Sequence, residues 1–91
     1  MVSKKADRQM LCDLFSIITS IKSKEDCEKL LGDLCTPKEI EQMAQRIKAA
    51  KLLLEGKTYL QVKAECDISS ATLSRVCHCV KYGEGYNRFL K

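Results

Sequence analysis

A short run of small hydroxyl side chains followed by one arginine offers the clearest chemistry in this chain. It contains Ser69, Ser70, Thr72, Ser74 and Arg75 and follows the tripeptide Cys66-Asp67-Ile68. Hydroxyl groups donate and accept hydrogen bonds, and a guanidinium can bind phosphate or guanine. Such a set is suited to contact DNA base edges and phosphates, provided that an exposed helix face presents it.

The cysteines raise two other possibilities, a metal site or a disulfide framework. Cys77 and Cys79 flank His78, but on a helix these two cysteines point about 200° apart and cannot chelate one ion. No Cys-x-x-Cys pair is present, so we expect no metal site. Met1–Asp7 shows no export signal, and the cysteines lie in apolar periodic segments. We therefore expect six reduced thiols that act as small hydrophobic groups.

Catalytic sets are missing among the remaining residues. We find no nucleophile with a base and an orienting partner, and no glycine loop that would cradle a phosphate, so we expect neither an enzyme nor a cofactor. Two alternatives stay open for the aromatic residues. His78 is either a pH-sensitive group or a solvent-facing helical histidine. Tyr59, Tyr82 and Tyr86 either stack on bases or pack at helix ends.

Apolar spacing predicts the helices that must position the polar run. Residues at three-and-four spacing predict a first helix from Lys5 to Ile21, and Ser23 is placed to cap a second. A third helix starts at Thr36, with Pro37 in its first turn and Glu39 completing a capping box. Gly56 fits the left-handed end of this helix. The apolar stripe of the first helix consists of Leu11, Leu14, Phe15, Ile18 and Ile21.

Residues 58–82 are predicted to form a helix-turn-helix. Thr58 and Gln61 form a second capping box, which opens a short helix to about Glu65. A tight turn follows, in which Asp67 is able to adopt a left-handed conformation. Ser69 caps a second helix to about Tyr82, and residues 86–91 form a short tail. The positions expected to face inward are Val62, Cys66, Ile68, Leu73 and Val76.

Composition fits one small globular chain. Of its 91 residues, 45% are hydrophobic and 31% charged, and the longest apolar run is Leu52–Leu54, too short for a membrane span. The net charge is +4, while residues 1–35 hold six basic and six acidic residues. The excess therefore lies in 36–91, either by chance or because that half faces an anion. A chain of this size buries only about 60–65% of its unfolded surface, so either its helices pack very well or it borrows core from a second copy.

Four segments at fixed separations resemble the Trp repressor superfamily. They are Leu34–Ile40, Ala44–Arg46, Leu54–Tyr59 and Ala71–Val76. With Cys79–Gly83 the chain is most similar to the TrpR-related YerC/YecD family, over roughly residues 8–90. The resemblance implies an all-α fold of about six helices and an intertwined homodimer. The N-terminal helices would interlock, and the two recognition helices would face successive major grooves of double-stranded DNA.

The resemblance also implies roles for individual residues. Lys63 would lie near the DNA backbone, and Ala71 and Thr72 in the base-reading turn. Arg46 and Arg75 match the two arginines that hold tryptophan in the Trp repressor.

The pocket departs from that pattern, because Val76 replaces a glycine and Cys79 replaces a serine. We therefore expect no tryptophan binding, and the two arginines would instead contact phosphate or the other subunit. Compared with the closer family, Asp67 adds a negative charge and His78 removes a positive one, which lowers the expected DNA affinity.

These observations together predict a cytoplasmic, homodimeric, sequence-specific DNA-binding regulator of transcription whose effector, if any, is not indicated. Residues 1–91 would form a single Trp repressor-like domain, with 1–35 serving mainly dimerisation and 58–82 forming the helix-turn-helix. The alternative is a helical protein–protein interaction module with little DNA affinity. The expected phosphate contacts are Lys57, Lys63, Arg75 and Lys81. The expected base contacts are Ser69, Ser70, Ala71 and Thr72.

Overall fold

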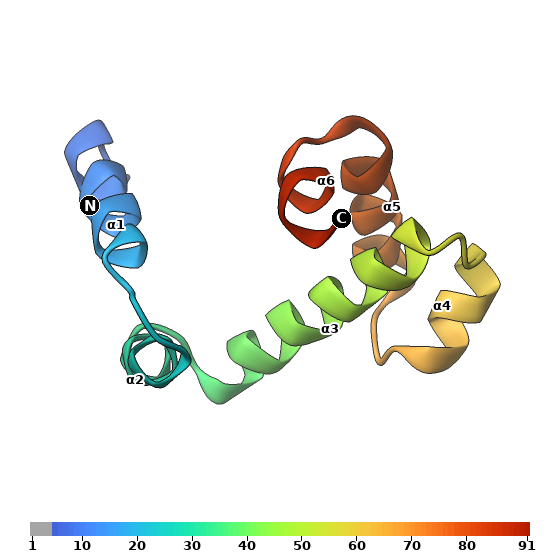
Figure 1. Cartoon of the computed structure of the whole chain (residues 1–91), viewed down its shortest axis with the longest axis horizontal. Helices are drawn as coiled ribbons and strands as arrows, with labels where there is room; N and C mark the ends of the chain where they lie inside the picture. Colours follow the sequence, from blue (N-terminus) through green and yellow to red (C-terminus); the bar gives the residue numbers. More distant parts are fainter. Residues whose placement is uncertain (1–4) are drawn as a thin grey trace. The chain divides into compact units, whose positions relative to one another are not determined.

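The computed structural model describes residues 5–91, in which six α-helices and no strands are present. Lys4, which was included in the charge balance, lies outside the described residues. The all-α class and the six helices that the resemblance implies are confirmed (Figure 1). None of the helices in residues 5–91 is both long and apolar enough to cross a membrane. The helices are α1 (Arg8–Thr19), α2 (Lys24–Leu34), α3 (Pro37–Leu54), α4 (Tyr59–Glu65), α5 (Ser70–Tyr82) and α6 (Gly85–Leu90).

The chain divides between Cys35 and Thr36 into two compact units. The boundary coincides with the end of the segment expected to serve dimerisation. The first unit holds α1 and α2, and neither helix contains a buried residue. Phe15, in the predicted apolar stripe, is 60% exposed. The first unit therefore has an amphipathic helix whose apolar side chains are largely uncovered within one chain.

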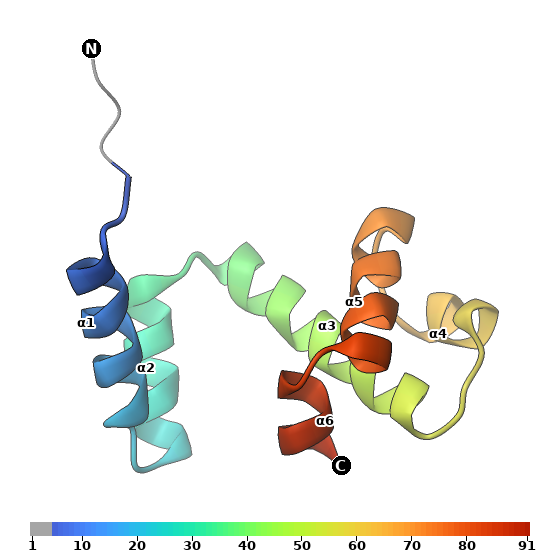
Figure 2. The same ribbon diagram turned by 90° about the horizontal axis from the view of Figure 1, so that it is seen from above.

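The second unit is built on α3. This helix contacts α4, α5 and α6, and both ribbon views show the three shorter helices gathered around its C-terminal half (Figures 1 and 2). Ala49 and Ala50 of α3 are fully buried, so the small side chains allow close packing at this point. All five positions predicted to face inward in the helix-turn-helix are buried. The core of this unit comprises Ala49, Ala50, Val62, Cys66, Ile68, Leu73 and Val76.

Local hydrogen bonds start α2, α3, α4 and α5 where the sequence predicts. Both capping boxes form, and in each the threonine hydroxyl and the N3 side chain satisfy backbone N–H groups reciprocally. The Thr36 N–H donates to Glu39 at 2.8 Å, and the Thr58 N–H donates to Gln61 at the same distance. Gly56 has a φ of 95°, as expected for the residue that follows the end of α3.

Three sequence predictions were wrong. The first helix is shorter than Lys5–Ile21, because the Asp7 carboxylate accepts the Met10 N–H and starts α1 at Arg8. Residues 85–90 form α6 instead of a tail, and the backbone Arg88 N–H donates to the Glu84 carbonyl. Asp67 is not left-handed, since every non-glycine residue in 5–91 has a negative φ. Its N–H is instead held by the side chain of Gln45.

Candidate nucleic-acid interface

The N-terminal end of α5 presents the hydroxyl run to solvent. Ser69 is the N-cap, and its Oγ accepts the Thr72 N–H at 3.2 Å. The same hydroxyl donates to Thr72 Oγ1 at 2.9 Å, so the hydroxyl proton of Thr72 stays free to donate elsewhere. Ser69, Ser70 and Ala71 are exposed, while Thr72 is half-buried. The four residues predicted to face base edges thus lie together at one exposed helix start.

Lys63 has a structural partner that the sequence did not reveal. Its Nζ donates to the carbonyl oxygen of Ile68, and the side chain is half-buried. The ammonium group therefore ties the end of α4 to the turn that leads into α5. An ammonium has three protons, and the other two remain available to a phosphate. The contact spans the turn, so helical periodicity could not have indicated it.

The other predicted phosphate contacts are exposed and lie on different parts of the second unit. Lys57 lies in the loop between α3 and α4, and Arg75 lies one turn into α5. Lys81 lies near the end of α5, where its Nζ is 5.4 Å from the centroid of the Tyr82 ring. These cations are not held in ion pairs in the part of the chain that the structure describes. They are free to meet phosphates at separate points.

The tyrosines and His78 differ in how they are held. The Tyr59 hydroxyl donates to the Ser70 carbonyl at 3.4 Å, which ties α4 to α5. Tyr86 is half-buried, whereas Tyr82 is mostly exposed. His78 is exposed and lies with its ring centroid 5.0 Å from that of Tyr82. Packing at helix ends therefore describes Tyr59 and Tyr86, and leaves Tyr82 and His78 on the surface.

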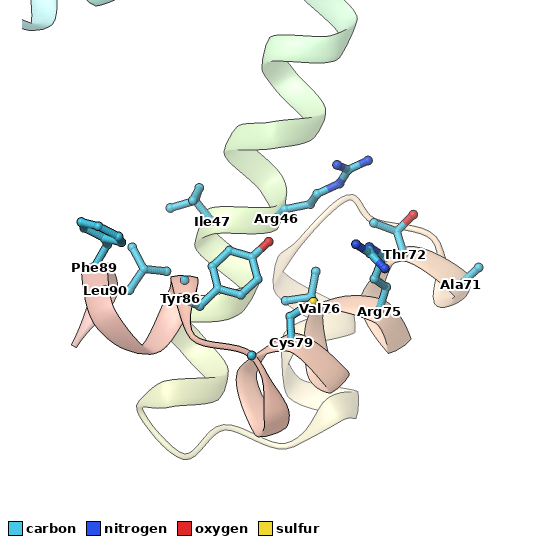
Figure 3. A pocket seen from close by; sticks show the side chains of 12 residues that line it. Arg46, Ile47, Ala71, Thr72, Arg75, Val76, Cys79, Tyr86, Phe89 and Leu90 are labelled. Atoms are coloured by element: carbon cyan, nitrogen blue, oxygen red, sulfur yellow. The ribbon is translucent and has the colours of Figure 1, made fainter. Parts of the chain in front are cut away.

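A cavity of about 660 Å³ lies between α3, α5 and α6. Arg46, Arg75, Val76 and Cys79, the four residues expected to form a ligand pocket, all line it (Figure 3). Val76 is only 2% exposed and forms part of the wall. No acidic side chain belongs to the described lining. Two guanidinium groups beside an apolar wall are chemically suited to an anion that carries an apolar group, and poorly suited to an ammonium group.

A second hollow shares Arg46 with the first and has a different chemistry. It measures about 480 Å³ and is lined mainly by polar residues of α3, the turn and the start of α5. Gln45 crosses it, since its Oε1 accepts the Asp67 N–H at 3.2 Å. Sequence reasoning missed this groove because α3 and the turn are about 20 residues apart and meet only in the folded unit. Thr72 lines both hollows.

Metal-ligating groups do not converge in the part of the chain that the structure describes. Residues 5–91 contain no group of three or more histidine, cysteine, aspartate or glutamate side chains that could hold a metal ion. All six cysteines are free thiols. Cys66 is buried in the core below the turn, and Cys79 lies at the cavity wall.

The chain is similar to known proteins in sequence and in fold. The family model described as Trp repressor protein matches residues 9–91. A curated protein of Bacillus subtilis (strain 168), named "Uncharacterized protein YerC", is 45% identical over 73 residues, which cover 80% of this chain and 70% of the relative.

Solved structures agree. A putative Trp repressor from Staphylococcus aureus matches with a TM-score of 0.85 and 34% identity, over 92% of this chain and 85% of the other. A TrpR-like protein from Eubacterium eligens ATCC 27750 matches with a TM-score of 0.81 and 38% identity, over 88% of this chain and 84% of the other.

Proposed function

The chain belongs to the Trp repressor family, and we propose that it is a sequence-specific regulator of transcription that binds double-stranded DNA. The observation that carries the proposal is the start of α5. Ser69, Ser70, Ala71 and Thr72 lie together at an exposed helix N-terminus that α4 and the turn support from behind. A recognition helix meets the major groove with this end.

Base contacts and phosphate contacts are divided between two sets of residues. The hydroxyl proton of Thr72 is free to donate to an acceptor on a base edge, because Ser69 occupies only an acceptor site of the oxygen. Lys57, Lys63, Arg75 and Lys81 neutralise phosphates around it. Phosphate contacts fix the register of the helix on the duplex, and base contacts choose the sequence.

A second copy completes the molecule in this proposal. The apolar side chains of α1 are uncovered within one chain, and a homodimer covers them. Two copies related by a twofold axis then present two α5 helices to successive major grooves, about 34 Å apart. The sites read by such a dimer are palindromic.

The cavity gives the proposed regulator no response to tryptophan. Arg46 and Arg75 would attract the carboxylate of an amino acid, but no acidic side chain among the lining residues is available to its ammonium group. Cys79 is a weak hydrogen-bond acceptor for that group. The two arginines are instead available to phosphate or to the second subunit.

The direct test is selection of bound duplexes from random DNA, followed by affinity measurements on the selected sequence and on a scrambled one. We expect an enriched palindromic sequence that binds at least about a thousandfold more tightly than the scrambled duplex. A chain that enriches no sequence and shows no salt-dependent binding would instead be a helical protein–protein interaction module. Thr72→Ala, with Thr72→Ser as its matched control, then identifies the surface used.

A further inference from the structure

Two predicted base contacts, Ser69 and Thr72, line one edge of the polar groove beside the turn, but Lys38 and Gln42 on its α3 side are not among the predicted DNA contacts. Residues Lys38, Gln42, Gln45 and Arg46 of α3 line one side of it, at positions that recur every three or four residues. They therefore form one polar stripe along the helix. Asp67 of the turn lines the other side, together with the start of α5.

We propose that this groove receives the sugar–phosphate backbone beside the recognition helix, with Lys38 and Gln42 as further DNA contacts and Asp67 as the residue that limits affinity. The proposal rests on the proposed function, because it assigns a second part of the same DNA surface. It extends the DNA surface from the helix-turn-helix to the first half of α3.

The groove is continuous with the edge that carries the base contacts. Ser69 and Thr72 line the groove and also belong to the exposed start of α5. A helix whose N-terminal end lies in a major groove has a phosphate strand on each side of that groove. In the proposal, one of the two strands that flank α5 passes along the polar groove.

Hydrogen-bond donors along the groove suit a phosphate strand. Phosphate oxygens take hydrogen bonds from cations, from side-chain amides and from hydroxyl groups. Lys38 and Gln42 are exposed, and neither side chain has a partner among the hydrogen bonds of residues 5–91. Gln45 is held at its oxygen by the Asp67 N–H, which leaves its amide protons to donate.

The charge balance explains why Asp67 opposes binding. Lys38 and Arg46 bring two positive charges, while Glu41 and Asp67 bring two negative ones. None of these four groups is held in an ion pair, since the salt bridge of the described residues joins Lys29 to Glu25. A carboxylate about 7 Å from a phosphate in water weakens binding by about threefold. The groove thus positions the strand while it keeps the total affinity moderate.

Two pairs of variants test the proposal with the full-length chain on selected and scrambled duplexes at several salt concentrations. Lys38→Ala is compared with Lys51→Ala, which removes the same charge about 220° further round α3. Asp67→Asn is compared with Glu84→Gln, which neutralises an acid outside the groove. Asp67→Asn retains the backbone N–H that Gln45 accepts, so the turn stays intact.

We expect Lys38→Ala to bind both duplexes about three- to tenfold more weakly, with a salt slope lower by about one unit for each phosphate that it no longer neutralises. Asp67→Asn should bind both duplexes at least about threefold more tightly. The two control variants should change the affinity for either duplex by no more than the change in net charge requires. Lys38→Gln should bind like Lys38→Ala if the fold is intact.

The proposal is overturned if Lys38→Ala binds the duplexes like Lys51→Ala, or if Asp67→Asn binds them like Glu84→Gln. The proposed function stands even when the groove proposal fails, provided that the parent binds both duplexes and Thr72→Ala loses affinity only for the selected one. A parent that binds no duplex overturns both.

Discussion

In the proposed DNA complex, the hydrogen bonds of Thr72 and Lys63 separate the tasks of recognition and attachment. Thr72 receives a bond from Ser69 and keeps its own hydroxyl proton. Lys63 gives one proton to the Ile68 carbonyl and keeps two. The first residue is therefore free to donate to a base acceptor, and the second offers its charge and two protons to a phosphate while it braces the turn. Mutations at the two positions should have different signatures.

Thr72→Ala and Lys63→Ala should lower DNA affinity in different ways. Thr72→Ala removes one donor and should cost about 1–3 kcal/mol on the selected sequence alone, with the salt slope unchanged. Lys63→Ala should weaken selected and scrambled duplexes about equally and lower the salt slope by about one unit for each half-site at which the contact is lost. It should also lower the free energy of unfolding by about 1–2 kcal/mol, because the Ile68 carbonyl is deprived of a charged donor.

Lys57→Ala serves as the control for Lys63→Ala, since it removes an exposed lysine whose side chain has no described hydrogen bond. It should lower the salt slope without changing the thermal midpoint. Equal behaviour of Thr72→Ala and Lys63→Ala on both duplexes would mean that α5 does not read bases.

Tryptophan should not bind at the cavity between α3, α5 and α6. Val76 forms part of its wall, Cys79 offers a poor acceptor, and the described lining provides two guanidinium groups without an acid. Calorimetric titration with L-tryptophan should give no heat beyond dilution at millimolar ligand. A dissociation constant in the micromolar range would show that the cavity accepts an amino acid after all.

At the scale of the helices, the capping box of α3 introduces a dependence on pH. The backbone N–H and the hydroxyl of Thr36 both bond the Glu39 carboxylate and lower its pKa below the ordinary value of 4.5. A lowered pKa in the folded state means that the ionised group stabilises the fold above the unfolded pKa. This contribution disappears as the pH falls from about 5 through the lowered value.

Glu39→Gln should therefore flatten the acid side of the stability profile. The amide can still accept the Thr36 N–H, but it does not titrate. Urea unfolding between pH 6 and pH 3 should show a smaller loss of stability for Glu39→Gln than for the parent. Glu41→Gln, two residues further along α3 and outside the box, should follow the parent. Identical stability profiles for the parent and Glu39→Gln would show that the ionised carboxylate does not stabilise the cap.

Features decided by neighbouring residues could be predicted from the sequence, and features decided by folding could not. The caps at Thr36, Thr58 and Ser69 depend on partners three residues away, and the sequence located all three. Helix α6 was missed because Gly83 and Gly85 indicate the end of a helix, and no side chain caps the start of α6. The Lys63–Ile68 and Gln45–Asp67 contacts cross the turn or join it to α3, so no local pattern contains them.

At the scale of the whole molecule, the uncovered apolar face of α1 predicts an obligate dimer. The mass in dilute solution should be twice that of the chain, and the thermal midpoint should rise with protein concentration. Phe15→Lys should abolish the dimer, because it places a charge in the covered face. Gln9→Lys changes an exposed polar position of the same helix and should leave the dimer intact. A monomeric mass with a concentration-independent midpoint would contradict the dimer.

DNA binding is the property on which the roles of α3, α5 and the dimer all depend, and its salt dependence is the decisive measurement. The affinity of the parent chain for the selected palindrome and for a scrambled duplex should be measured between about 50 and 200 mM salt, where phosphate contacts have a large effect. We expect log affinity to fall linearly with log salt for both duplexes, with the selected one bound more tightly throughout. Two superimposed curves, or no binding to either duplex at low salt, would show that the chain is not a sequence-specific DNA-binding protein.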